Sequence, residues 1–270
     1  MTGTRVKVLL AALLLCGFAA VPTAPASAAP GDLCADQVAA TRALQARIAA
    51  HNATPHQFKL PDQAAALDAF NAEAAALNVQ KAAVLARAQA CVEAMAALAD
   101  TDATAMDLAP VPADVRAAIE AARAKLPAVR PLYDVLREYH PGPAGTLVLK
   151  GQPKPEPGAP DPAYPAGSGR TYGRSATGGP AASPSRIVPL AEIVNMPGFT
   201  GLTAQNMYAV IRAPLNYQWL SWSAQRSARS RSVALMEGVD PRWQAAQVAL
   251  HDRIRQQLQG IIASLLSSQG

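Results

Sequence analysis

The segment from Asp62 to Ala99 is rich in alanine, and it constrains the fold more than any other feature of the chain. Alanine is the strongest helix former, and few β-branched residues interrupt it here. The larger apolar side chains recur at spacings that place them towards one side of a helix, and they are Leu67, Phe70, Leu77, Val84, Leu85, Cys91, Met95 and Leu98. This pattern predicts one long helix with a narrow apolar seam.

A shorter helix is predicted before it, from about Cys34 to His51. Val38, Leu44 and Ile48 recur there at three- and four-residue spacing together with alanine neighbours. The intervening segment, Asn52 to Pro61, contains two prolines and is expected to be an extended connection. The two helices are therefore expected to form an antiparallel hairpin.

The first 28 residues have the composition of an export signal. Arg5 and Lys7 precede an apolar run from Val8 to Val21, and Ala26-Ser27-Ala28 provides small residues for cleavage. The run is shorter than the roughly 20 residues that a spanning helix needs, and no later segment is long and apolar enough to do so. We expect a protein that is secreted or held in the cell envelope, with no stable membrane span after cleavage.

Cleavage would leave two cysteines, Cys34 and Cys91, and an exported protein with two cysteines favours one disulfide. Cys34 lies about 26 Å of helix before His51, and Cys91 lies about 45 Å after Pro61. Ten linker residues at up to about 3.3 Å each can span that difference. The bond is therefore sterically possible and would close the open end of the hairpin.

Composition divides the rest of the chain. We expect a helical hairpin domain over 29–140, which includes further helices at about Ala113–Leu126 and Pro131–Glu138. Residues 141–184 are rich in Pro, Gly, Ser and Ala and are predicted to be a disordered linker. Residues 185–270 are predicted to be a small α+β domain ending in a long helix. The fold class is therefore mainly α.

The C-terminal segment has its own sequence signals. Ile187–Val194 is short and apolar and predicts a strand or a strand leading into a turn, and Leu215–Ser223 has strand-like residues. Thr203 is expected to cap a helix over Ala204–Arg212. Asp240-Pro241 is a strong start for the final helix, because the aspartate can cap and the proline fits the first turn.

Two strings in this segment, Ile187-Val188-Pro189-Leu190 and Val194-Asn195-Met196-Pro197-Gly198-Phe199, carry a family resemblance. The stretch from Ser185 to Ser232 resembles the HNH-type, endonuclease VII-like nuclease modules found at the C-termini of secreted bacterial toxins. The resemblance implies a ββα-metal fold, in which a histidine on the first strand activates water. A metal held by further His, Asp or Asn side chains would stabilise charge on the scissile phosphate.

The chain departs from this family at the residues that carry the chemistry. Where the family has Asp-His, the chain has Ser185-Arg186, and Gln225 stands in place of a family asparagine. Asn216 matches a further family asparagine. Arginine cannot act as a base near neutral pH, and no pair of residues in this segment has metal-ligand spacing. We expect catalysis to be lost and no cofactor to be bound, with a divalent metal required only if nuclease activity is retained.

The basic charge of the chain lies in the same segment. Residues 185–270 contain 8 arginines against 4 acids, whereas residues 32–140 contain 13 acids against 10 bases. Arginine forks suit phosphate oxygens and aromatic rings can stack on bases. The residues predicted to contact nucleic acid are Arg186, Arg212, Asn216, Gln225, Arg226, Arg229 and Arg231.

Three functional hypotheses remain open at this point. The first is an exported protein whose degenerate HNH-like domain binds nucleic acid or a protein partner without cleavage. The second is an active metal-dependent nuclease that uses a nonstandard base, with His251 as the candidate. The third is a non-catalytic envelope or extracellular protein that binds a partner through the helical hairpin.

Overall fold

The computed structural model describes residues 5–7, 34–55, 57–99, 110–142, 147–228, 233 and 236–269, with the backbone alone for 5–7 and 35. The structure is 59% helix and 10% strand, which confirms the prediction of a mainly α protein. The predicted signal, residues 1–28, lies outside the described residues apart from the short strand β1 (Arg5–Lys7).

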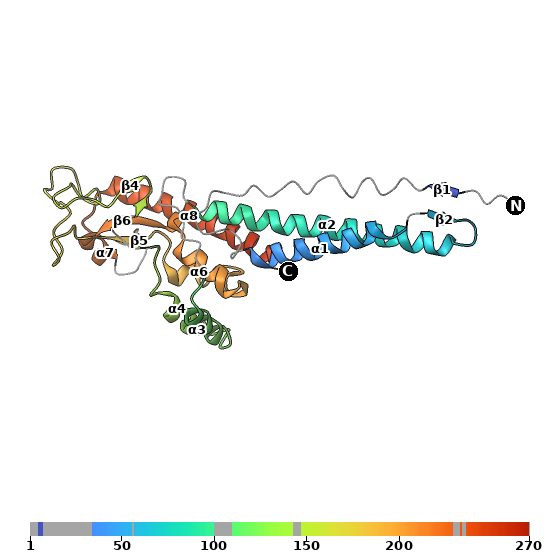
Figure 1. Ribbon diagram of the computed structural model, residues 1–270. Coiled ribbons are helices and arrows are strands. Elements are labelled where there is room, and N and C mark those ends of the chain that lie inside the picture. Colours follow the sequence, from blue (N-terminus) through green and yellow to red (C-terminus); the bar gives the residue numbers. More distant parts are fainter. Residues whose placement is uncertain are drawn as a thin grey trace.

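The predicted helical hairpin is present and projects from one end of the molecule (Figure 1). Helix α1 spans Ala35–Ala53 and helix α2 spans Ala64–Leu98. Strand β2 (Gln57–Lys59) lies in the connection between them and pairs antiparallel with β1. The hairpin has a thin core, because the buried cluster between its helices consists of Leu44, Ile48 and Leu77, with Val84 packed against it.

The predicted disulfide between Cys34 and Cys91 is also present, and it joins the start of α1 to α2. Its two Cα atoms lie 6.1 Å apart, and both cysteines are buried. The bond therefore closes the hairpin at the end that faces the rest of the molecule.

The last helix, α8 (Pro241–Ser268), packs along α2, as Figure 1 shows. Its start is capped as predicted, because the Asp240 carboxylate accepts hydrogen bonds from the backbone N–H groups of Arg242 and Trp243. At its other end, the Gln37 side chain of α1 donates to the backbone carbonyl of Ser268. α8 therefore ends where α1 begins, and both helices lie against α2.

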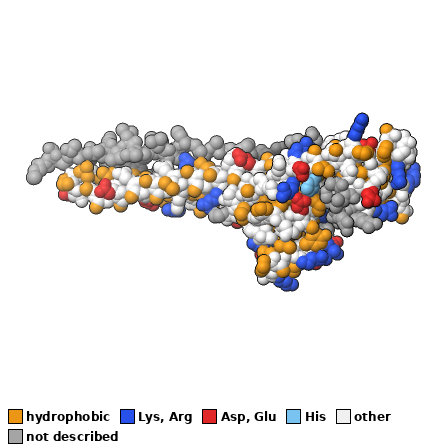
Figure 2. All heavy atoms as spheres, turned by 180° about the vertical axis from the view of Figure 1, so that it is seen from behind, with side chains coloured by type: hydrophobic (Ala, Val, Ile, Leu, Met, Phe, Trp, Pro, Cys, Tyr) orange, Lys and Arg blue, Asp and Glu red, His pale blue; other side chains and the backbone are white. Residues whose placement is uncertain are grey.

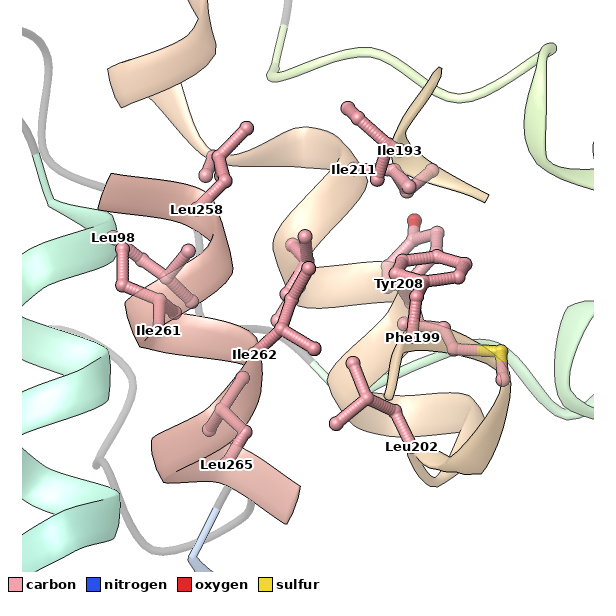
Figure 3. Packing of buried hydrophobic residues seen from close by; sticks show 14 of the residues in the cluster. Leu98, Ile193, Phe199, Leu202, Tyr208, Ile211, Leu258, Ile261, Ile262 and Leu265 are labelled. Carbon is pink, nitrogen blue, oxygen red and sulfur yellow. The ribbon is translucent and has the colours of Figure 1, made fainter. Parts of the chain in front are cut away.

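A single hydrophobic cluster joins α2 and α8 to the C-terminal segment. Figure 3 shows Leu98 of α2 beside Ile261, while Ile262 of α8 points towards Phe199 and Leu202. The elements on that side of α8 are α5 (Leu190–Ile193), the 3₁₀ helix η3 (Phe199–Gly201) and α6 (Ala204–Arg212). The predicted N-terminal and C-terminal domains thus share one core.

Two further helices, α3 (Ala113–Arg123) and α4 (Arg130–Leu136), pack on each other, and α3 also contacts α6. Their amphipathic pattern buries Val115, Ile119 and Leu132 in the shared cluster. A side chain also fixes this pair to α6, because the backbone N–H of Val111 donates to Gln205 Oε1 at 2.7 Å.

The C-terminal strands form an antiparallel pair of β5 (Ala182–Arg186) and β6 (Tyr217–Ser221), in which Arg186 is opposite Tyr217. The 3₁₀ helix η4 (Pro214–Asn216) precedes β6, and helix α7 (Trp222–Ala228) follows it. The prediction of a strand over Ile187–Val194 is wrong. Strand pairing stops at Arg186, and Pro189 caps α5, since proline suits a helix start.

The prediction of a disordered linker is wrong for residues 147–184. Strands β3 (Val148–Leu149) and β4 (Gln152–Pro153) form a short hairpin. Leu149 and Tyr172 are buried in a cluster with Tyr217 and Trp219 of β6. The segment is ordered because a few widely spaced apolar side chains reach β6, although its composition resembles that of a linker.

Candidate functional site

The face of the β5–β6 pair that packs against α7 carries the positions where the resembled family has an aspartate and an asparagine. Gln225 of α7 lies over this face. Its Nε2 donates to Ser185 Oγ at 2.6 Å, and its Oε1 accepts from Ser183 Oγ at 2.9 Å. The structure therefore brings Ser185 and Gln225 together, and it joins them by a neutral hydrogen bond.

Arg186 lies on the opposite face, because side chains alternate along a strand. Its Nη2 donates to the backbone carbonyl of Tyr139 at 2.5 Å, and its guanidinium carbon lies 5.5 Å from the centre of the Tyr217 ring. Tyr217 is fully buried and donates to the Ile211 carbonyl at 2.8 Å. Burial raises the pKa of Tyr217 to about 12, although the nearby Arg186 charge acts in the other direction.

Arg212 makes a similar contact with His140, the residue after Tyr139. It is buried, its Nε donates to the carbonyl of His140 at 3.1 Å, and its guanidinium carbon lies 4.7 Å from the centre of the Tyr208 ring. Burial lowers the pKa of His140, and the charge of Arg186 lowers it further. Two arginines thus hold the backbone that follows α4, of which Arg212 is buried and Arg186 is partly buried.

Asn216 has a structural contact as well. It is fully buried, its Oδ1 accepts from the Val188 backbone N–H at 2.8 Å, and its Nδ2 donates to the Val188 carbonyl at 3.0 Å. These two bonds continue the β5–β6 pairing by one step with a side chain in place of a strand residue. The amide is therefore buried and bonded to Val188 through both its oxygen and its nitrogen.

Of the residues predicted to contact nucleic acid, Arg226 alone is exposed among those that the structure describes. Its Nε donates to the Trp222 carbonyl one turn earlier at 3.3 Å, and the Trp222 residue is 43% exposed. Arg229 and Arg231 lie outside the described residues. The predicted basic surface is therefore reduced, in the described part of the chain, to this one pair on α7.

His251, the candidate nonstandard base, lies at the contact between α8 and α5. Its Nε2 is 2.9 Å from Glu192 Oε2 and its Nδ1 is 3.2 Å from Asp252 Oδ1. Arg255 also contacts Glu192, with 2.7 Å between Nε and Oε1. Both ring nitrogens already have carboxylate partners. Within the described residues, no group of three or more His, Cys, Asp or Glu side chains could hold a metal ion.

The hairpin carries a surface feature that sequence reasoning missed. A groove with a volume of about 210 Å³ runs between α1 and α2, and Ala40, Ala43 and Ala83 line it together with Arg47 and Arg87. The signal was present in the sequence, because both helices place Ala, an aliphatic residue and Arg at the same spacing, in Ala43-Leu44…Arg47 and Ala83-Val84…Arg87. We call this feature the hairpin groove.

The rest of the hairpin surface is also weakly polar. Figure 2 shows hydrophobic side chains distributed along its length with few charges between them. The large apolar residues exposed on the two helices include Val38, Val79, Leu85 and Val92. In the described part of the chain, no helix has the length and apolar content needed to cross a membrane.

Comparison of the chain with protein-family models, with curated proteins and with solved structures finds no match.

Proposed function

We propose that this protein is an exported, non-catalytic binding protein. In it, the remnant of an HNH-like module serves as a scaffold and the helical hairpin binds a protein partner. The observation that carries the proposal is the replacement of a catalytic constellation by internal bonds. Gln225 joins Ser183 and Ser185, and Arg186 donates to Tyr139 where the resembled family has its histidine.

These contacts are incompatible with the chemistry of the resembled family. A general base must accept a proton near neutral pH, and the arginine pKa exceeds 12. Hard divalent cations prefer carboxylate oxygens, whereas a serine hydroxyl and a glutamine amide are neutral. Ser185 and Gln225 also use their polar atoms on each other, so a metal ion would have to break that bond.

The internal hydrogen bonds of Arg186 and Arg212 favour a protein partner over nucleic acid. Affinity for nucleic acid depends on exposed cations that neutralise phosphates, and Arg186 and Arg212 donate to backbone carbonyls inside the fold. The hairpin, by contrast, exposes long helical faces with apolar side chains (Figure 2). The groove between the two helices is a feature in which the helix of a partner protein can dock.

A second candidate function rests on the exposed pair Trp222 and Arg226 of α7. An aromatic ring that stacks on a base and an arginine one turn away that contacts a phosphate form the minimal elements of a single-strand binding surface. Loss of salt-dependent retardation in Trp222→Ala would assign any nucleic-acid binding to this pair.

The test incubates purified protein with plasmid DNA and with RNA in Mg²⁺, Mn²⁺ or Zn²⁺, and scores cleavage and gel retardation together. We expect no cleavage by the wild-type protein with any of the three ions. A matched variant, Ser185→Asp with Arg186→His and Gln225→Asn, restores the family's residues at these three positions and is measured beside the wild-type protein in the same assay. Cleavage by the wild-type protein would refute the proposal, and its loss in His251→Ala would identify that residue as the base.

A further inference from the structure

We propose that the hairpin groove binds an acidic amphipathic helix of another protein. The inference rests on the proposed function, because it names the surface and the partner chemistry of the same hairpin. The groove lies on the two helices themselves, so a third helix can lie along it as in other helix-in-groove complexes.

Two cross-helix contacts fix the register of the hairpin. Cys34 bonds Cys91 and His51 contacts Glu73. In both pairs the two residue numbers add up to about 125, so a residue of α1 lies level with the residue of α2 whose number is 125 minus its own. Arg87 therefore lies level with residue 38 of α1, about nine residues from Arg47. At 1.5 Å per residue, the two arginines are about 13 Å apart along the hairpin axis. They mark opposite ends of the groove, one on each helix.

The floor between the arginines is apolar and recessed because it is built from alanines. Ala40, Ala43 and Ala83 border the groove, and Leu44 and Val84 of the hairpin core lie beneath them. A cavity of about 150 Å³ is large enough for a benzene ring, so the 210 Å³ groove can take a leucine or an aromatic side chain. Occupation would also add apolar contacts to a hairpin whose own core is thin.

Charge complementarity selects the occupant. Among the described residues that line the groove, both ionisable ones are arginines and none is an acid. Arg47 Nη1 donates to Gln80 Oε1 at 2.6 Å, which directs the guanidinium across the groove and leaves further N–H donors of this five-donor group for a carboxylate. A second copy docking through the same face would bring arginine against arginine. The groove therefore favours a helix that carries acids two turns apart with an apolar side chain between them.

The test uses a fluorescein-labelled helical peptide with Glu at positions i and i+7 and Leu at i+3 and i+4, and a comparison peptide with Lys in place of Glu. Fluorescence anisotropy with the full chain should show binding of the Glu peptide at least about tenfold tighter than the Lys peptide, weakening as salt rises. Arg47→Glu should reduce this preference about tenfold. Arg42→Glu makes the same charge change at an exposed position of α1 outside the groove, and it should leave the preference unchanged.

A steric pair of variants tests the groove independently of charge. Ala43→Trp should fill it and abolish peptide binding, whereas Ala46→Trp, exposed on the same helix but outside the groove, should not. Equal binding of the two peptides, or binding retained in Ala43→Trp, would overturn the inference. A dimer in sedimentation that Ala43→Trp dissociates would assign the groove to a second copy and would also overturn it. None of these outcomes changes the result of the nuclease assay. The proposal for the groove and the proposal of a non-catalytic protein can therefore be refuted independently.

Discussion

Removal of the disulfide gives the sharpest quantitative test of the hairpin. Replacing Cys34 and Cys91 together by alanine removes a bond that closes a loop across a sequence separation of 57 residues. The loop-entropy relation, −2.1 − 1.5R ln n in cal/mol/K, gives about 4 kcal/mol at 25 °C for a loop of this length. We expect the free energy of unfolding to fall by about 4 kcal/mol or slightly more, because alanine also leaves a small void at two buried positions.

The loss should be large relative to the stability of the hairpin. Its own buried cluster contains Leu44, Ile48 and Leu77, and burying one such side chain contributes about 1.5–3 kcal/mol. The conformational entropy of ordering more than fifty helical residues opposes this gain. In the double variant, the part of the hairpin held only by contacts between α1 and α2 should therefore unfold before the core that α2 shares with α8.

The assay is urea unfolding followed by circular dichroism, for the oxidised protein, the reduced protein and the double variant. Reduction should shift the midpoint of the wild-type protein towards that of the variant, and it should leave the variant unchanged. A second readout, limited proteolysis, should place the first new cleavage sites of the variant in α1. A loss below about 1 kcal/mol, or two titratable thiols at positions 34 and 91 in the unfolded oxidised protein, would refute the reasoning.

Three further predictions concern pH and packing. The folded-state pKa of Tyr217 is raised to about 12, so its contribution to stability should be complete below pH 10 and lost between pH 10 and 12; Tyr217→Phe should reduce that loss in unfolding experiments at high pH. The pKa of His140 is lowered by burial, so stability should fall as pH drops below about 6.5, and His140→Gln should flatten the fall. Leu98→Ala should cost about 2–5 kcal/mol in urea unfolding, whereas the exposed Val79→Ala should cost under about 0.5.

Local sequence signals predicted the longer helices well, but they missed α5 and α7. The helix expected over Ala204–Arg212 has those bounds, and Thr203 caps it by accepting from the Asn206 backbone N–H. The hairpin and its disulfide followed from alanine content, apolar spacing and the reach of the connection. Each of these features depends on residues that are near one another in sequence or on one distance estimate between two cysteines.

The order of residues 147–184 depends on contacts that composition does not reveal. Lys150 donates to the carbonyl of Leu215, and the Trp219 indole donates to the carbonyl of Gln152. The partners are more than sixty residues apart, and a segment with so few apolar residues can fold only when a preformed surface such as β6 receives them. The strand predicted over Ile187–Val194 was misplaced for the same reason. Pairing with β6 determines where β5 begins and ends, and the local sequence does not show this pairing.

The sequence could not predict where the Arg186 and Arg212 side chains point, because their partners are also far away in the chain. The proposed resemblance to HNH modules places Arg186 at the position of a family histidine, and the sequence does not show that its guanidinium reaches a carbonyl 47 residues earlier. The contact of Arg186 with Tyr139 also affects the stability of the variant that carries Ser185→Asp, Arg186→His and Gln225→Asn. Histidine at position 186 is too short to supply the same donor, and the Tyr139 carbonyl would lose its partner, which costs about 1–3 kcal/mol if the group stays buried. The variant that regains the family's residues should therefore be less stable than the wild-type protein, and thermal unfolding without metal should show it. An equal or higher midpoint would mean that the contacts of Arg186 contribute nothing to the fold.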